Sequence, residues 1–147
     1  MESKDKTKQI KLIMNWEKKL KNIYTKHLSS KIKQLVFILN ETTSKELDSK
    51  TIKLINFLIE SLGEFKQSKL AQIEFMNRIL NKDQLYPILT HSDKQIKKID
   101  SLMEDLRDLK SLKEEDAQNI ILSLDKLREE INTEILEEII LLNKLKY

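Results

Sequence analysis

The chain has 147 residues, of which 35% are charged and 39% are hydrophobic, and its formal net charge is +3. A chain of this length can bury a modest core, and this composition is typical of long helices, which argues against disorder throughout. The single glycine and single proline argue against a sheet with many tight turns and against glycine-rich phosphate loops, while the absence of cysteine excludes disulfides and thiolate metal sites.

The first forty residues predict an amphipathic helix or a pair of helices. Apolar residues recur every three or four positions, which places them on one helix face, at Ile10, Ile13, Trp16, Leu20, Ile23 and Tyr24, and again from Ile32. The pattern covers about residues 6–40, and Ser29–Ser30 marks either a break or a soft turn within it.

A loop and a second long apolar pattern follow. Residues 41–44 lack periodicity and are rich in side chains that hydrogen-bond their own backbone, which predicts a loop. Asp48 or Ser49 is placed to cap the next helix, whose apolar face continues to Leu80. Gly63 either lies within this helix or begins a kink.

The segment 81–92 contains the only proline, Pro87, which disfavours helix at the residue before it. We therefore expect a single helical domain, 1–147, with a candidate hinge at 81–92. This hinge would separate a helical part, 1–80, from a coiled-coil-like part, 93–147. Ser92 and Gln95 form a capping-box pattern at the start of the second part.

Two further patterns predict the C-terminal helices. Ile96, Ile99, Met103 and Leu106 follow the rhythm of a coiled-coil seam. A second capping-box pattern, Ser111 with Glu114, precedes a last helix over about 112–145. The sequence thus predicts an all-α fold, an elongated bundle of four or five helices, whose coiled-coil-like region at 93–145 is a hairpin or a bent long helix.

The last helix carries more apolar side chains than one antiparallel neighbour can cover. Residues 139–142 are all apolar and surround a full helical turn, which must therefore be covered on every side. This turn is either the centre of the bundle or an interface, and we favour association with a partner protein or a second copy. The predicted partner-binding residues are Leu122, Leu136, Ile139, Ile140, Leu141 and Leu142.

The charge is polarised along the chain. Residues 1–50 hold 12 lysines and 6 acidic residues, a net of +6, whereas residues 111–147 hold 5 basic and 9 acidic residues, a net of −4. On a helical wheel six lysines share an arc opposite the apolar stripe: Lys4, Lys8, Lys11, Lys18, Lys19 and Lys26. We favour a solvated face, with or without pairing to the acidic last helix, over contacts with nucleic-acid phosphates, and we rank contacts with an anionic membrane surface last. The absence of arginine from 1–50 weakens the nucleic-acid interpretation.

No pattern predicts catalysis, a cofactor or a metal. The two histidines, His27 and His91, fit neither a Glu-x-x-His nor a His-x-x-x-His spacing. Acidic pairs such as Glu129–Glu130 and Glu137–Glu138 are explained by solvated helix faces. We therefore expect no catalytic, cofactor-binding or metal-binding residues and infer no small-molecule substrate.

These observations predict a non-enzymatic helical interaction subunit or adaptor, which assembles with partner proteins or with itself in a larger complex. The alternative is an accessory nucleic-acid-binding protein that uses the lysine-rich face for sequence-independent phosphate contacts. Because the sequence shows neither a secretory leader nor an apolar stretch long enough to span a bilayer, we expect a cytoplasmic location, or a nuclear one in a eukaryote.

Overall fold

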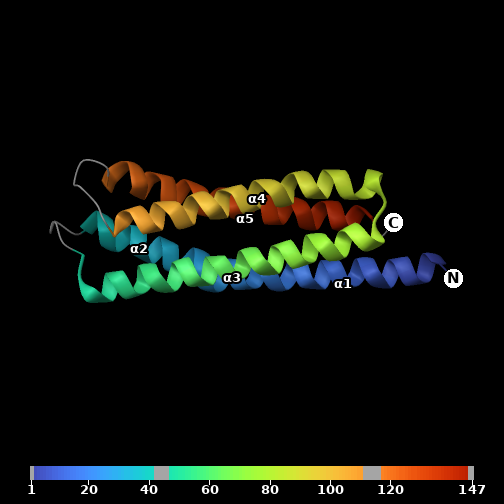
Figure 1. Cartoon of the computed structure of the whole chain (residues 1–147), viewed down its shortest axis with the longest axis horizontal. Coiled ribbons are helices and arrows are strands. Elements are labelled where there is room, and N and C mark those ends of the chain that lie inside the picture. Colours follow the sequence, from blue (N-terminus) through green and yellow to red (C-terminus); the bar gives the residue numbers. More distant parts are fainter. Residues whose placement is uncertain (1, 42–46, 111–116, 146–147) are drawn as a thin grey trace.

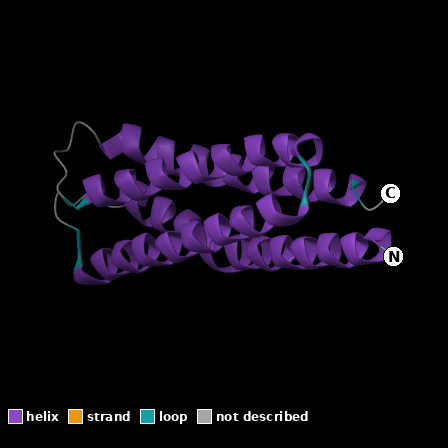
Figure 2. Cartoon of the chain, turned by 45° about the vertical axis from the view of Figure 1, so that its right-hand side comes forward, coloured by secondary structure: helices purple, strands orange, loops and turns teal. Residues whose placement is uncertain are grey.

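The computed structural model describes residues 2–41, 47–110 and 117–145, and for residues 2–4 and 117 it describes the backbone alone. The elements are α1 (Glu2–Ile23), a π-helical turn η1 (Tyr24–Ser29), α2 (Ser30–Glu41), α3 (Ser49–Ile79), α4 (Lys82–Leu109) and α5 (Ala117–Lys144). The described residues contain no strand (Figure 2). The predicted all-α fold is confirmed.

The helices form an elongated bundle of rods (Figure 1). α1, η1 and α2 make one continuous rod, and α3, α4 and α5 make the others. Each rod runs antiparallel to the one before it, and α5 packs against both α4 and the first rod. The region from α4 to α5 is therefore a helical hairpin rather than a bent long helix, and the two ends of the chain lie at the same end of the bundle.

The π-helical turn joins α1 and α2 without a break. Tyr24, at its start, is completely buried, and its hydroxyl donates to the backbone oxygen of Arg128 in α5 at 2.7 Å. Burial raises the pKa of the Tyr24 phenol, which keeps this donor protonated. Ser29–Ser30 therefore lies within a continuous rod that Tyr24 fastens to α5.

The start of α3 follows the prediction from the sequence. Asp48 is the N-cap, and its side chain accepts a hydrogen bond from the Thr51 backbone N–H at 2.7 Å. Gly63 lies inside α3, where an added Cβ atom would meet Met103 Cε at 3.6 Å, an ordinary contact distance. Residues 42–44 of the predicted loop, and the capping box predicted at 111–114, lie outside the described residues.

Most of the segment 81–92 is helical in the structure, although Pro87 disfavours helix at the residue before it. α4 begins at Lys82, and Asn81 caps it: the Asn81 side chain accepts from the Gln84 backbone N–H at 2.9 Å, and Gln84 accepts in return. Pro87 lies inside α4 at an exposed position near the helix start, where its ring removes one helical hydrogen bond next to water. The capping box predicted at Ser92 and Gln95 is wrong, because both residues are buried in mid-helix.

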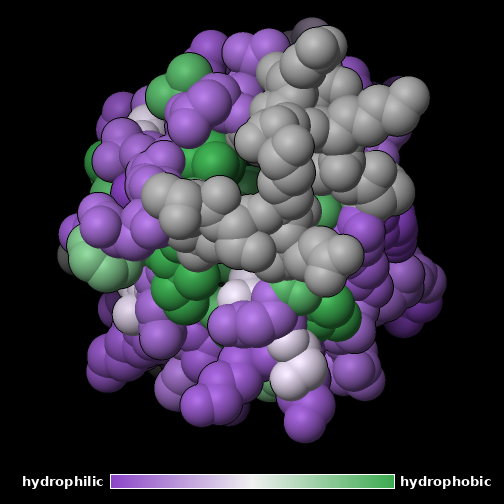
Figure 3. Space-filling model, turned by 90° about the vertical axis from the view of Figure 1, so that its left-hand side faces the viewer, coloured by the Kyte–Doolittle hydropathy of each residue, from purple (hydrophilic) through white to green (hydrophobic). Residues whose placement is uncertain are grey.

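The apolar core is divided into two groups along the bundle. The larger group includes Leu35, Leu58 and Leu106, and the smaller group, toward the end with both termini, includes Ile13 and Met76. The described surface seen at the opposite end is mostly hydrophilic at its margin, with hydrophobic side chains nearer its middle (Figure 3). Polar residues occupy the level between the two apolar groups in every rod.

Candidate functional site

Six polar side chains, here called the polar layer, cross the core between the two apolar groups. Every rod contributes, and each of the six residues is 0% exposed. The layer consists of Glu17 in α1, Lys69 and Gln72 in α3, Ser92 and Gln95 in α4, and Glu138 in α5. Fully buried acidic and basic residues are rare unless they are paired, so this layer is the most unusual feature of the core.

Lys69 joins the two carboxylates of the polar layer. Its ammonium donates to both oxygens of Glu17, at 3.0 and 2.8 Å, and to Glu138. Gln72 also donates to Glu17, at 2.7 Å. All three hydrogens of the ammonium group therefore have acceptors, as a buried lysine requires.

The α4 side chains complete the contacts of Glu138. Gln95 donates to it at 2.5 Å, and the Ser92 hydroxyl donates to its other oxygen. The side-chain oxygens of Gln72 and Gln95 have no hydrogen-bond partner among the described residues. Two acceptor atoms of the polar layer are therefore left without a hydrogen bond.

The charges of the polar layer are also unbalanced, because one ammonium faces two carboxylates. Burial raises the pKa of Glu17 to about 7, against the lowering influence of Lys69 and with a further increase from Glu138. A proton on Glu17 makes the layer neutral. The layer can therefore hold and release a proton near neutral pH, but its complete burial leaves no access for a substrate.

A second polar cluster lies between α4 and α5 near the surface. It consists of His91, Glu134 and Glu137 and is here called the His91 triad. His91 Nδ1 lies 2.6 Å from Glu134 Oε2 and 3.1 Å from Glu137 Oε2. Lys98 donates to the other oxygen of Glu134 at 3.0 Å. Burial raises the pKa of Glu134, but hydrogen bonds from His91 and Lys98 outweigh it and hold the pKa below its ordinary value.

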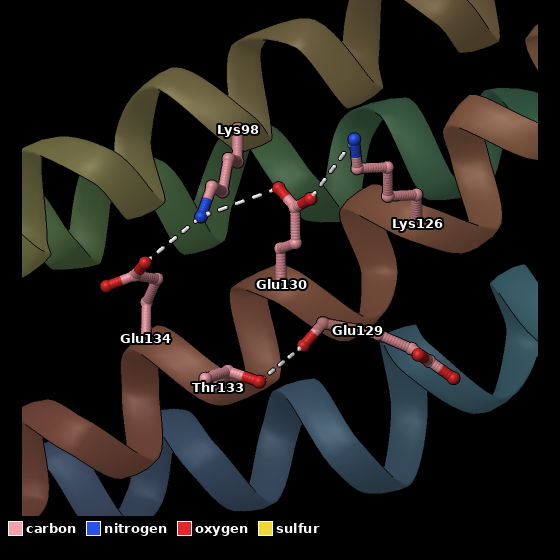
Figure 4. Close-up of a pocket in the computed structure, with 6 residues that line it drawn as sticks. All are labelled: Lys98, Lys126, Glu129, Glu130, Thr133 and Glu134. Carbon is pink, nitrogen blue, oxygen red and sulfur yellow. Dashed lines mark hydrogen bonds and ion pairs between the residues drawn. The ribbon is translucent and has the colours of Figure 1, made fainter.

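A shallow pocket of about 260 Å³ adjoins the His91 triad on α5 (Figure 4). Lys98 lies between Glu134 and Glu130, and Lys126 contacts Glu130 from the far side at 3.8 Å. Glu129, the remaining charged residue of the lining, pairs with a neighbouring arginine at 3.3 Å. Because Lys98 and Lys126 each already pair with a carboxylate, the pocket offers little to an anionic ligand.

The predicted partner-binding residues divide between the surface and the interior. Leu122, Leu136 and Ile140 are 67%, 39% and 56% exposed. Their spacing of fourteen and four residues places them on one side of the helix, here called the α5 outer face. Ile139 and Leu141 are partly buried against the core, and Leu142 is completely buried, so its side chain is not accessible to a partner.

The lysines predicted to contact phosphates lie on the surface of the first rod. Lys8, Lys11, Lys18, Lys19 and Lys26 are exposed, whereas the side chain of Lys4 lies outside those described. The acidic residues of α5 form their ion pairs with residues of α3, α4 and α5. Among the described side chains, no ion pair joins the exposed lysines to α5, so these lysines are not paired with the acidic last helix there.

The sequence did not predict the polar layer or the His91 triad. The histidine and the nearest glutamate of the triad are 43 residues apart, and motif spacings along one helix cannot find ligands on two helices. A usable signal was the acidic or amide side chain that interrupts the apolar stripe of each helix, at Glu17, Gln72, Gln95 and Glu138.

No protein-family model, curated protein or solved structure matches this chain. No described helix combines the length and the apolar character that crossing a membrane requires. The features on which a function can rest are therefore the α5 outer face, the exposed lysines, the polar layer and the His91 triad.

Proposed function

We propose that the protein is a non-enzymatic helical interaction subunit, which binds a partner helix or a second copy of itself through the α5 outer face. The supporting observation is the exposure of Leu122, Leu136 and Ile140 on a helix whose inner face is already used by the bundle. Burying such side chains contributes about 25 cal/mol for each Å² of apolar surface removed from water.

The arrangement of the α5 outer face suits a helix laid along it. Leu136 and Ile140 are one turn apart, and Leu122 lies roughly 21 Å from Leu136 along the axis at 1.5 Å per residue. Exposed polar residues, Lys126 and Glu129 among them, lie between the two apolar ends. Such side chains contribute more to orientation and specificity than to affinity, which matches a partner that binds in one register.

Light scattering coupled to size-exclusion chromatography tests self-association directly. Wild type would be compared with Ile140→Glu and Leu12→Glu over a wide range of concentration. Leu12 is 59% exposed on α1, against 56% for Ile140 on α5, so the control introduces the same charge at a similarly exposed site. We expect wild type and Leu12→Glu to associate and Ile140→Glu to remain monomeric.

If the wild type is monomeric, the next test is whether the α5 outer face binds a different protein. Tagged Ile140→Glu and Leu12→Glu chains would then be used for affinity capture from cells that produce this protein. Loss of a bound protein from Ile140→Glu alone is the expected result. Identical captured proteins for the two variants, together with a monomeric wild type, would contradict the proposal.

The same chromatography tests the alternative of phosphate binding. A short duplex would be added at low and at high salt, because contacts between lysine and phosphate weaken steeply as salt rises. A mass shift at low salt that is lost in Lys11→Glu with Lys18→Glu, but kept in Ile140→Glu, would favour the lysine face over the α5 outer face.

A further inference from the structure

The His91 triad brings three metal-ligand atoms to one point on the bundle. His91 Nδ1, Glu134 Oε2 and Glu137 Oε2 face one another, and the ligand atoms of the three residues lie within 4.8 Å of one another. Imidazole nitrogen and carboxylate oxygen are ligands that first-row divalent metals take in proteins. We propose that the His91 triad binds a divalent transition-metal cation, for which Zn²⁺ is the best probe.

The separation between His91 and Glu137 fits such a cation. Metal–ligand bonds of about 2.0–2.2 Å place neighbouring donors roughly 3.0–3.4 Å apart in octahedral or tetrahedral geometry. The distance from His91 Nδ1 to Glu137 Oε2, 3.1 Å, is already in this range. The distance to Glu134 Oε2, 2.6 Å, is that of a charge-assisted hydrogen bond, so a cation would take the place of the bridging proton with a small outward movement.

The donors are held by two helices and by a further contact. Glu134 and Glu137 are three residues apart on α5 and share a face, while His91 approaches from α4. Lys98 binds Oε1 of Glu134, which leaves Oε2 directed at His91, and such outer contacts typically orient metal ligands.

Exposure gives the cation a route from solvent. The side chains of His91 and Glu137 are 21% and 47% exposed, whereas that of Glu134 is 10% exposed. Water can therefore supply the remaining ligands. The imidazole nitrogen favours Zn²⁺ over Mg²⁺ and Ca²⁺, which prefer oxygen donors. A bound cation would also tie α4 to α5 and stabilise the folded chain by mass action.

Titration calorimetry and thermal unfolding with zinc chloride test this proposal on the full chain without a histidine tag. We expect one equivalent to bind and to raise Tm, with magnesium chloride producing no comparable effect. His91→Gln and Glu137→Gln should each weaken zinc affinity at least tenfold, because even the loss of a residue that only orients a metal ligand typically costs that much. His27→Gln, which alters the exposed histidine of η1, is the matched control and should bind as wild type does.

Several results would overturn the proposal. These are an absence of zinc binding by wild type, an equal Tm shift with magnesium, or loss of affinity in His27→Gln rather than in His91→Gln. Glu137 is nearly half exposed, so Glu137→Gln tests the site even if His91→Gln fails to fold. Circular dichroism of each metal-free variant separates a lost ligand from a lost fold. None of these results depends on the α5 outer face.

Discussion

Glu17 is a completely buried carboxyl group that shares one ammonium with a second carboxyl group. Its pKa of about 7 in the folded chain compares with an ordinary value of 4.5. Between these two values the folded chain keeps a proton that the unfolded chain has lost. Folding therefore takes up a proton in this window, and stability falls as pH rises through it.

The Glu17→Gln variant should remove this pH dependence. The stability of wild type relative to Glu17→Gln should fall by roughly 2–3 kcal/mol between pH 5 and pH 8, because each pKa unit corresponds to about 1.4 kcal/mol. Urea unfolding at several pH values measures the difference. The pKa values of Glu134 and Asp48 are lowered, so their contributions to folding stability are lost only at more acidic pH. This loss is the same in both proteins. Parallel profiles between pH 5 and pH 8 would show that Glu17 has no raised pKa.

At the scale of the element, the start of α4 depends on Asn81. Asn81→Ala removes the acceptor for the Gln84 N–H and should lower the free energy of unfolding by about 1 kcal/mol. Asn81→Asp keeps an acceptor and adds a favourable charge at the helix N-terminus, so it should match or exceed wild type. Urea unfolding measures both variants. Equal destabilisation by alanine and aspartate would mean that tertiary packing, and not the cap, fixes this helix start.

The same helix shows what local sequence signals could and could not predict. Apolar periodicity predicted the helices and the hairpin alternative, and Asp48 predicted a cap. Pro87 indicates a break because proline disfavours helix at the residue before it, but the capping box at Asn81, six residues earlier, starts a helix that continues through Pro87. Ser92 and Gln95 have the spacing of a capping box, which predicts a helix start, but they lie inside α4. The same spacing of three residues lets both side chains reach Glu138 on the neighbouring helix.

At the scale of the whole molecule, the polar layer aligns all the rods at one level. Sequence alone could not predict this alignment, because it depends on which residues of four antiparallel rods meet. Shifting one rod by a turn would separate Lys69 from a carboxylate and leave a buried charge without its partner. The cost of such a shift favours a single register, as buried polar residues do in coiled coils.

This interpretation predicts opposite effects for partial and complete removal of the layer. Lys69→Met leaves two buried carboxyl groups without their cation and should lower stability by about 3–5 kcal/mol. Replacing all six members with apolar residues of similar size should restore wild-type stability or exceed it. Urea unfolding of both variants measures the difference. A six-residue variant less stable than Lys69→Met would mean that the layer contributes net stability rather than register alone.

The antiparallel order of the rods has a further consequence for how the protein can be joined to other molecules. The start of α1, the end of α5 and the turn between α3 and α4 all lie at one pole of the bundle, while α2 ends and α3 begins at the other. A fluorescent label or tether attached at either terminus would therefore occupy the same pole, close along α5 to Ile140. The opposite pole would remain unobstructed whichever terminus was used.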